Sequence, residues 1–460
     1  MRIPVRYIGV FAALLFLTCV TQSSYAQILT GKTSNAPGYV RMQPTNIHVV
    51  TPFTPGAVLV IPRNVKTTRG LSPFAAASAG SGGTGGFVSR NAATTTGGGG
   101  GNIIGLQTVP TFLGAFAGFA GPSAGTVFPF VMMGNDPLVG GTTTIPTNIT
   151  EISWQLLNAD GSVFTTVSFA PFEDVTTDSP NFASFLYEDS PTRTQFADAI
   201  QRAEFFNLMK PSWHTELGQP NIVNRVTIQV PFFVNVQLPD GSIIQARSYF
   251  TGTAGDGSTF VLMLDLLYSF FYDNQVVNDI SVNNFTTNAV NVDMLPNTFT
   301  FSLNVNNPNV PGGCCVLGSH TYFFDPSSTP QPRWLSISAS WISPGLFGGG
   351  FGDITALSHE ISETFNDPFI NNIVPTWQFP GQPANSTVCK NTLETGDPIE
   401  VLSTATIPLT LNEGKDIFTF HPQNEALLQW FEMGPSSNAI DGAFSFPLET
   451  ILTQSAVPCP

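Results

Sequence analysis

Three residues in the last third of the chain have the types and the spacing of a metal-dependent hydrolytic site. His359, Glu360 and Glu363 form an H-E-x-x-E motif. A helix advances about 100° per residue, so His359 and Glu363 project from one face and can bind the same cation. Glu360 lies between them and can accept a proton from a water molecule on that cation. The motif is that of the H-E-x-x-H metallohydrolases, with a carboxylate in place of the second histidine.

The motif lacks the third protein ligand that a catalytic zinc takes. Downstream, Glu394 and Asp397 lie three residues apart on a predicted tight turn, and either could complete the site, with Glu394 favoured. Asp367 follows His359 by eight residues, near the expected end of the helix. It is a third candidate ligand, a partner that orients His359, or a cap of the turn before Pro368.

The carboxylate that replaces a neutral imidazole adds negative charge, which makes a bound metal a weaker Lewis acid and favours harder cations. We expect Zn²⁺, the cation of the H-E-x-x-H sites, and the added carboxylate makes Ca²⁺ or Mn²⁺ the alternatives. A purely structural Ca²⁺ site is a second interpretation. A third is an exposed helix whose acidic side chains face solvent.

The other histidines are weaker candidates. His320 could stabilise a developing oxyanion, orient the site as a catalytic residue, or serve as a structural residue of a strand. His214 and His421 have no chemical context in the sequence and are predicted to pack or to cap.

The motif has to lie on a helix. Asp353 is a natural N-cap for a helix that runs to about Phe365, and Pro368 cannot continue it. The strand before the helix is predicted at Trp334–Ile342, joined to it by the Gly-rich turn Gly345–Gly352. This order of strand and motif helix resembles the metal-binding half of zincins, in which an edge strand beside the active-site helix binds extended substrate.

Alternating apolar residues and turn signals predict the other elements. The predicted strands are Ile149–Leu157, Ser162–Phe169, Arg225–Val236, Ile243–Phe250, Phe299–Val305 and Cys315–Phe324. Helices are predicted at Thr194–Leu208 and Asn424–Phe431, and residues 258–272 form a buried element for which helix is favoured over strand. The expected fold class is α+β, with a mixed β-sheet and a metal-binding motif helix.

Composition divides the chain into four parts. Residues 1–26 have the charged start, apolar stretch and small-residue end of an export signal. Residues 27–105 are a Gly/Ser/Thr/Pro-rich tether that we expect to be disordered. Residues 106–235 are the β-rich first part of the folded domain, and 236–460 are the zincin-like domain. No stretch is long enough to span a membrane, so we expect a secreted, extracellular protein, with the periplasm as an alternative.

The charge is distributed unevenly along the chain. Residues 27–135 carry six Lys or Arg and no acid, whereas residues 136–460 carry 8 basic and 31 acidic residues. The acidic part would repel nucleic acid and anionic lipid, and it would tolerate bound cations. We therefore expect no nucleic-acid partner.

The cysteines that follow the signal are Cys314, Cys315, Cys389 and Cys459. Export permits disulfides, and four cysteines allow three pairings, among which the sequence does not choose. Neighbouring cysteines rarely bond each other, so we expect one of Cys314 and Cys315 to bond Cys389 and the other to bond Cys459. A cysteine-ligated zinc site is disfavoured, because the chain lacks C-x-x-C spacing.

The motif region also matches a wider pattern. Ser358–Glu363, Asn366–Pro368 and Glu394–Asp397 read S-H-E-I-S-E, N-D-P and E-T-G-D. This series resembles the signature of a group of secreted bacterial proteins. It is also distantly similar to the plant phosphate-induced, EXORDIUM-like proteins, whose pattern is roughly S-H-E-L-A-E…N-P…E-I-A-D. Cys314–His320 and Leu427–Trp430 resemble two further motifs of that group.

The resemblance covers about residues 195–435. It implies a zincin-like metal site on His359, Glu363 and either Glu394 or Asp397, with Glu360 as the base. The predicted protein is a secreted, metal-dependent hydrolase, a peptidase, whose substrate is a peptide or an extracellular polymer along the edge strand. The alternative is a non-catalytic, EXORDIUM-like extracellular binding or structural protein, in which a metal or ion network joins the motif helix to the turn at Glu394.

Overall fold

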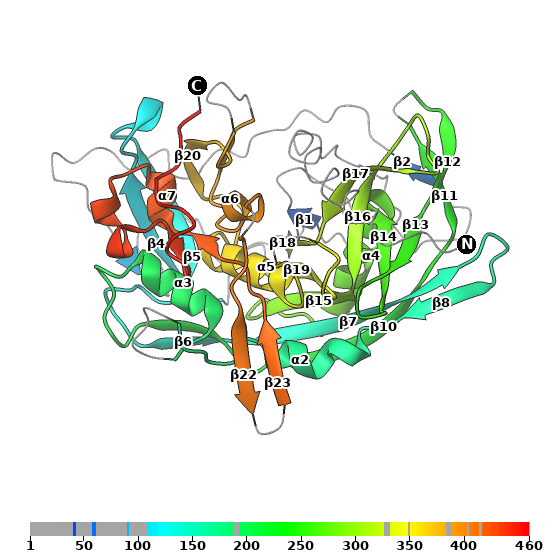
Figure 1. Cartoon of the computed structure of the whole chain (residues 1–460), viewed down its shortest axis with the longest axis horizontal. Helices are drawn as coiled ribbons and strands as arrows, with labels where there is room; N and C mark the ends of the chain where they lie inside the picture. The colour runs from blue at the N-terminus through cyan, green and yellow to red at the C-terminus, as the bar shows by residue number, and fades with distance from the viewer. Residues whose placement is uncertain are drawn as a thin grey trace.

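The computed structural model describes residues 109–460 apart from 188–192, 239, 326–331, 348–349, 383–387, 403, 414–415 and 460. It also describes the backbone of Val40–Met42, Val58–Val60 and Arg90–Asn91, and the backbone alone of residues 412–413 and 416–417. The predicted export signal and most of the predicted tether lie outside these residues. The described part is a mixed α and β structure, mostly strands with a few helices (Figure 1). Among the described residues, no helix is long and apolar enough to cross a membrane.

The largest described sheet is mixed. Its strands, in spatial order, are β1 (Val40–Met42), β18 (Gly318–Phe324), β19 (Arg333–Trp341), β15 (Val290–Pro296), β7 (Thr147–Leu157) and β10 (Asn221–Val230), with β8 (Val163–Val167) paired to β7. Strands β19, β15, β7 and β10 are parallel, whereas β18 runs antiparallel to β19. The expected mixed sheet is therefore present, and β18 is the antiparallel strand next to the motif helix.

Helix α5 (Thr355–Asn366) carries the motif and packs on one face of this sheet, against β18 and β19 (Figure 1). Helix α3 (Phe196–Glu204) packs beside it. Leu357 and Ile361 of α5 join the apolar core to which Ile337 of β19 belongs. All 12 residues of α5 are buried. The interpretation of an exposed helix whose acids face solvent is therefore wrong.

Helix α4 (Asp265–Ser281) packs on the opposite face of the sheet through both apolar contacts and polar side chains. The Tyr272 hydroxyl lies 2.7 Å from Ser336 Oγ of β19. Thr150 of β7 donates to Asp279 Oδ2 at 2.7 Å. Because side chains alternate along a strand, Thr150, Ile152 and Trp154 of β7 share the face toward α4, whereas Ile149 joins the apolar core of α5.

The remaining elements surround this sheet. The other strands are β2 (Val58–Val60), β3 (Arg90–Asn91), β4 (Thr111–Ala117), β5 (Val127–Met133), β6 (Thr142–Ile145), β9 (His214–Leu217), β11 (Phe233–Gln237), β12 (Ile243–Arg247), β13 (Tyr249–Thr253), β14 (Thr259–Leu264), β16 (Thr298–Leu303), β17 (Pro311–Val316), β20 (Ile373–Trp377), β21 (Lys390–Thr392), β22 (Leu409–Glu413), β23 (Asp416–Phe420), β24 (Glu425–Ala426) and β25 (Ser445–Phe446). The short helices are α2 (Glu173–Thr177), α6 (Asp397–Glu400) and α7 (Leu428–Glu432), with 3-10 turns η2 (Gly121–Ser123), η3 (Ala170–Phe172), η4 (Ser436–Asn438) and η5 (Ile440–Gly442).

Four predicted elements are divided differently in the structure. The strand predicted at Ile243–Phe250 covers β12 and the start of β13, and the strand predicted at Cys315–Phe324 covers the end of β17 and all of β18. The strand predicted at Arg225–Val236 is two strands, β10 and β11, because Pro231 lies between them and has no N–H to donate. Residues 258–272 contain a strand, β14, followed by the start of α4. The change occurs at Asp265, whose Oδ1 accepts a hydrogen bond from Leu266 N at 2.7 Å. The favoured interpretation of one helix over this stretch is therefore wrong for its first half.

The helix predicted at Asn424–Phe431 is also shorter than expected. Its first part is strand β24, and α7 begins only at Leu428. The predicted hairpin of β7 and β8 is confirmed, as is the helix α3.

Three short strands from the predicted tether pair with the folded domain. β1 pairs antiparallel with β18, β2 pairs parallel with β11, and β3 pairs antiparallel with β4. These strands belong to the sheets of the domain, whereas the rest of residues 27–105 lies outside the described residues.

Because the motif helix packs on a close-packed apolar core, we expect a cavity made there to lower the free energy of unfolding substantially. Ile361→Ala is expected to lower the free energy of unfolding by about 2–5 kcal/mol, because Ile361 is fully buried. Ile243→Ala makes the same chemical change at a position that is 57% exposed, and should stay within about 0.5 kcal/mol of wild type. Chemical denaturation of both variants measures the difference. Equal losses would contradict the interior position of α5.

Helix α7 contains a buried carboxyl group without a compensating charge. Burial raises the pKa of Glu432 to about 8. Burial also raises the pKa of Glu204, which accepts a hydrogen bond from Leu428 N at 3.1 Å, and the charge of Glu432 adds to that rise. The folded protein therefore favours protonated Glu432. This contribution to stability is fully present below about pH 4.5 and is lost as the pH rises through about 8.

Glu432→Gln is expected to remove this pH dependence, because an amide of the same shape carries no charge at any pH. The variant should be more stable than wild type at pH 8.5, by about 2–4 kcal/mol, and close to it at pH 4. Thermal unfolding across this pH range measures the effect. Parallel curves for the two proteins would show that Glu432 does not titrate with folding.

Candidate metal centre

Helix α5 is held at its start by Asp353. Asp353 Oδ1 accepts hydrogen bonds from Ile354 N at 2.7 Å and from His421 N at 2.8 Å. The other oxygen, Oδ2, lies 2.7 Å from His421 Nδ1, and this contact raises the pKa of His421. The observed N-cap is Ile354, so Asp353, the predicted N-cap, lies one residue before it. It joins the beginning of the motif helix to the end of β23.

The motif brings three side chains of α5 together. His359, Glu360 and Glu363 offer ligand atoms that lie within 4.8 Å of one another. His359 Nε2 is 3.2 Å from Glu363 Oε2. The i, i+4 spacing on one helical face therefore produces the expected convergence of imidazole and carboxylate.

His320 reaches the same carboxylates from β18. Its Nδ1 lies 3.2 Å from Glu360 Oε2 and 3.2 Å from Glu363 Oε2. This contact arises because β18 lies beside β19 under α5. The structure thus places His320 in the site.

Glu394 completes a second group of ligand atoms. His320, Glu363 and Glu394 offer atoms within 4.8 Å of one another. The turn after Glu394 also contacts the helix, since Gly396 N donates to Glu363 Oε1 at 3.1 Å. The expected trio of His359, Glu363 and Glu394 is therefore divided between two groups that share Glu363.

The other two predicted ligands have different partners. Asp367 Oδ1 accepts hydrogen bonds from Asn371 N at 2.9 Å and Asn372 N at 3.1 Å, and so caps the turn after α5. Burial raises the pKa of Asp367 to about 7. Asp397 begins α6 and forms an ion pair with Lys390. Within the described part of the chain, neither carboxylate joins the groups at Glu363.

Sequence reasoning missed Glu425. This residue lies in the two-residue strand β24, is 0% exposed, and interacts electrostatically with His359, Glu363 and Glu360. The only signal in the sequence is an acid directly before the apolar run Ala426–Leu428. The fold brings it to the site from the far side of the α6 turn, since Ala426 N donates to Thr395 O at 2.8 Å.

In three residues of the site, neighbouring charges shift the pKa in the direction opposite to the effect of burial. Burial alone would lower the pKa of His320 and of His359, but the surrounding glutamates outweigh it and raise both well above the ordinary value. Burial would raise the pKa of Glu363, but the charge of His359 and the hydrogen bond from His320 hold it well below its usual range. Glu363 is therefore the ionised group between two imidazoles.

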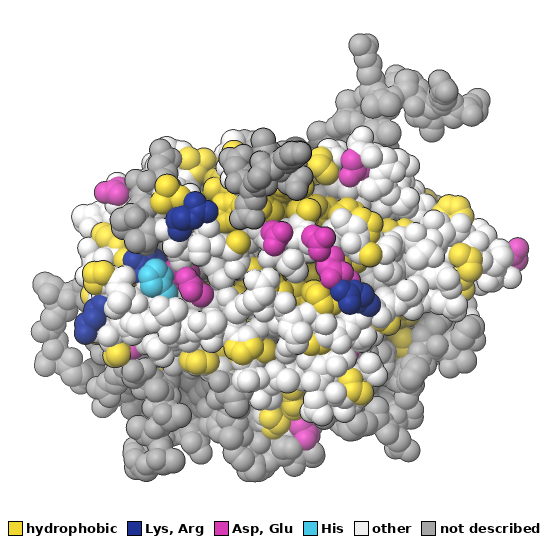
Figure 2. Space-filling model, turned by 90° about the horizontal axis from the view of Figure 1, so that it is seen from below, with side chains coloured by type: hydrophobic (Ala, Val, Ile, Leu, Met, Phe, Trp, Pro, Cys, Tyr) yellow, Lys and Arg dark blue, Asp and Glu magenta, His cyan; other side chains and the backbone are white. Residues whose placement is uncertain are grey.

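In the other carboxyl groups of the site, burial has the largest effect on the pKa. Burial raises the pKa of Glu360, Glu394 and Glu425, and in Glu394 the charge of Glu363 adds to the rise. Only 10% of the chain is charged, and the surface in Figure 2 shows few charged side chains among uncharged ones. Several of these scarce charges are thus collected in the interior around one helix, which is costly without counter-charge.

The donor set fits a metal cation. Imidazole nitrogens and carboxylate oxygens are the ligands of catalytic zinc, and donors bound to one tetrahedral Zn²⁺ at 2.0–2.1 Å lie about 3.3 Å apart. The observed spacing is 3.2 Å from Glu363 Oε2 to each imidazole nitrogen. The excess of carboxylates is equally compatible with Ca²⁺ or Mn²⁺.

Two glycines make room for the site. A Cβ at Gly396 would lie 2.3 Å from His359 Nδ1, and a Cβ at Gly318 would lie 2.7 Å from Glu360 Oε1. Any larger residue at either position would displace a site side chain. The absence of a side chain at Gly318 and Gly396 therefore lets the backbone approach Glu360 and His359 closely.

A separate group of possible ligands lies near the start of α3. Asp198, His214 and Glu216 offer atoms within 4.8 Å of one another. Asp198 Oδ2 accepts from Thr194 Oγ1 at 2.5 Å and lies 2.8 Å from His214 Nδ1, while its Oδ1 accepts from Thr215 N at 2.6 Å. Hydrogen bonds within the protein thus occupy both Asp198 oxygens, in agreement with the predicted structural role of His214.

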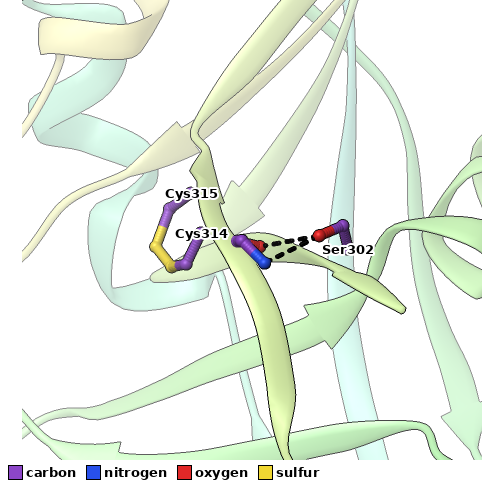
Figure 3. The surroundings of a disulfide bond; sticks show 4 residues. Ser302, Cys314 and Cys315 are labelled. Atoms are coloured by element: carbon purple, nitrogen blue, oxygen red, sulfur yellow. Dashed lines mark hydrogen bonds between the residues drawn. A yellow bond between two sulfur atoms is a disulfide. The ribbon is translucent and has the colours of Figure 1, made fainter. Parts of the chain in front are cut away.

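The disulfides differ from the predicted pairing. Cys314 bonds its neighbour Cys315, and Cys389 bonds Cys459. The peptide bond between Cys314 and Cys315 is cis, which brings their Cα atoms to 3.1 Å. The pair lies in β17, where Gly313 N donates to Ser302 Oγ at 2.7 Å (Figure 3). The rule that neighbouring cysteines avoid each other therefore fails here.

No protein-family model, curated protein or solved structure matches this chain. The function is therefore argued from the geometry of the site.

Gly396→Ala is expected to weaken cation binding at least tenfold, because the new methyl group would overlap the His359 ring. Gly218→Ala is the matched control, since a Cβ there has no neighbour closer than 3.5 Å. Titration of chelator-treated protein with Zn²⁺, monitored by calorimetry, compares the two variants. Unchanged affinity in Gly396→Ala would mean that His359 is not a ligand.

Proposed function

We propose that this protein is a secreted, metal-dependent hydrolase, with peptidase as the most specific form of the proposal. The supporting observation is the position of Glu363 Oε2, which lies 3.2 Å from both His320 Nδ1 and His359 Nε2. Glu360 and Glu394 belong to the two ligand groups that meet at this oxygen. Zn²⁺ is the proposed cation, with Ca²⁺ or Mn²⁺ as alternatives.

A bound cation would polarise a substrate carbonyl and acidify a water molecule. The side chains of the protein supply the rest. Glu360 would accept the proton of that water, and burial, which raises its pKa, makes it a better base than an exposed glutamate. Glu360 Oε2 lies 3.2 Å from His320 Nδ1, so the proposed base stands directly beside the imidazole of β18.

The proposed substrate is an extended peptide or extracellular polymer along β18. This antiparallel strand carries His320 and lies beside the motif helix, as an edge strand does in the zincins that the sequence resembles. Strand β1 pairs with Tyr322–Phe324, and His320 lies in the other half of β18. Strand β1 does not extend along that half, so a substrate strand could pair there instead.

Secretion is supported by the cysteines. Two disulfides within the described residues fit an oxidising compartment, whereas thiols in the cytosol are kept reduced. The export signal predicted at residues 1–26 would deliver the chain there.

A second candidate function is a non-catalytic binding or structural protein with a structural cation. The observation that favours it is burial: His359, Glu360 and Glu363 are only 8%, 5% and 2% exposed. A cation there would bind side chains of both α5 and the turn at Glu394, and so would hold the two segments together. Structural sites are closed in this way, whereas catalytic sites keep an open position.

Glu360→Gln separates the two functions. For a hydrolase, the variant should keep its cation but lose at least about 100-fold in turnover, because the amide cannot accept a proton. Hydrolysis of a fluorogenic peptide library and elemental analysis of the same samples measure both quantities. Glu216→Gln, in the separate group with Asp198 and His214, is the control and should behave as wild type.

Full turnover in Glu360→Gln would exclude Glu360 as the base. If wild-type protein hydrolyses no peptide or polymer, while chelation lowers its melting temperature, the structural function is supported instead.

A further inference from the structure

The ligand atoms around Glu363 form two groups, one on each side of this carboxylate. One group contains His359 and Glu360 of the motif helix, and the other contains His320 of β18 and Glu394 of the turn before α6. Glu363 is the member that both groups share. A single-cation site would need one set of donors, whereas this arrangement offers two.

We propose that the centre binds two divalent cations bridged by the carboxylate of Glu363. The first cation would lie between Glu363 and His359, and the second would lie between Glu363, His320 and Glu394. This inference rests on the metal centre of the proposed function and extends it from one cation to two. Bridged two-metal sites hold their cations about 3.5–4 Å apart and clamp both oxygens of a hydrolytic reaction.

The distances support a bridge. Glu363 Oε2 is 3.2 Å from an imidazole nitrogen of α5 and 3.2 Å from an imidazole nitrogen of β18. Each distance matches two donors on one cation. The other oxygen of Glu363 is held by the backbone N–H of Gly396 at 3.1 Å, which fixes the orientation of the bridging group.

The formal charges also favour two cations. Four buried or half-buried carboxylates, those of Glu360, Glu363, Glu394 and Glu425, surround the two histidines. Lys390, the nearby cation of the chain, is paired with Asp397. With all four carboxylates ionised and both imidazoles neutral, as cation binding would require, one divalent cation would leave a net charge of about −2, whereas two would leave none.

Glu425 is an independent indication of a missing partner. It is 0% exposed, and neither of its oxygens accepts a hydrogen bond in ordinary geometry, although the Thr395 hydroxyl lies close to it. Its strongest attraction is to His359. A buried carboxylate in this state needs a proton, a water molecule or a cation, and Glu425 lies on the side where the first cation would bind.

The test is the cation stoichiometry of the full mature chain. Chelator-treated protein is titrated with Zn²⁺ and, in parallel, with Mn²⁺, and the bound equivalents are measured by elemental analysis after gel filtration. Wild type should bind about two equivalents, and His320→Ala and His359→Ala about one each. Glu363→Gln, which keeps the shape of the bridge, should lose affinity for both. Circular dichroism verifies that each variant is folded.

The control is His214→Ala, which disrupts the group near the start of α3 and should still bind two equivalents. Wild type loaded with two Mn²⁺ should also give an exchange-broadened electron paramagnetic resonance spectrum, and His320→Ala the six lines of an isolated ion.

The possible outcomes separate the two proposals. One equivalent in wild type, lost in both His320→Ala and His359→Ala, would overturn the two-cation centre and leave the proposed hydrolase intact. Two equivalents that fall to one in His214→Ala would place the second cation elsewhere and overturn the bridge. No bound cation in wild type would overturn both proposals.

Discussion

The site depends on one interaction, the contact of the Glu363 carboxylate with an imidazole on either side. One imidazole comes from the same helix and the other from the neighbouring strand, so the contact joins α5 to β18. A charged group in the interior is tolerated only when it is paired and hydrogen-bonded. Glu363 meets both conditions through His320, His359 and the N–H of Gly396. Every other side chain of the centre is placed relative to this carboxylate.

The fold supplies the enclosure that makes these charges strong. Helix α5 is buried along its whole length between the sheet, α3 and the C-terminal turns, so its polar residues face protein and not water. Low polarity strengthens each attraction and raises the cost of each unpaired charge. The same enclosure explains why Gly318 and Gly396 stand where the backbone approaches the motif side chains most closely.

The helix and its motif could be predicted because they follow from local spacing. His359 and Glu363 converge wherever Thr355–Asn366 is helical, and Pro368 marks the end of the helix. Glu425 could not be predicted, because a two-residue strand has no periodicity and its approach to His359 depends on the folding of distant chain. The cysteine pairing was predicted wrongly, because the prediction used the general avoidance between neighbouring cysteines, and Cys314 and Cys315 are an exception to it.

The change from strand to helix within residues 258–272 could not be predicted from the sequence either. An apolar run has the same appearance in a buried strand and a buried helix. The structure changes from one to the other at Asp265, where a side-chain oxygen accepts the first helical N–H. The fold class could be predicted from the alternation of strand-like and helix-like stretches. The exact bounds of each element depended on single contacts such as this one.

The disulfide between Cys389 and Cys459 has a consequence for the carboxylates that it encloses. It closes a loop with a sequence separation of 70 that contains both Glu394 and Glu425. Closing a loop of this length removes conformational entropy from the unfolded chain, worth roughly 4 kcal/mol in the loop-closure model. Cys459 N also donates to Thr376 O at 3.1 Å, which fixes the last residues against β20. The redox conditions around the protein would therefore set how firmly these two carboxylates are held, and a reductant would loosen the site by breaking a bond that neither carboxylate touches.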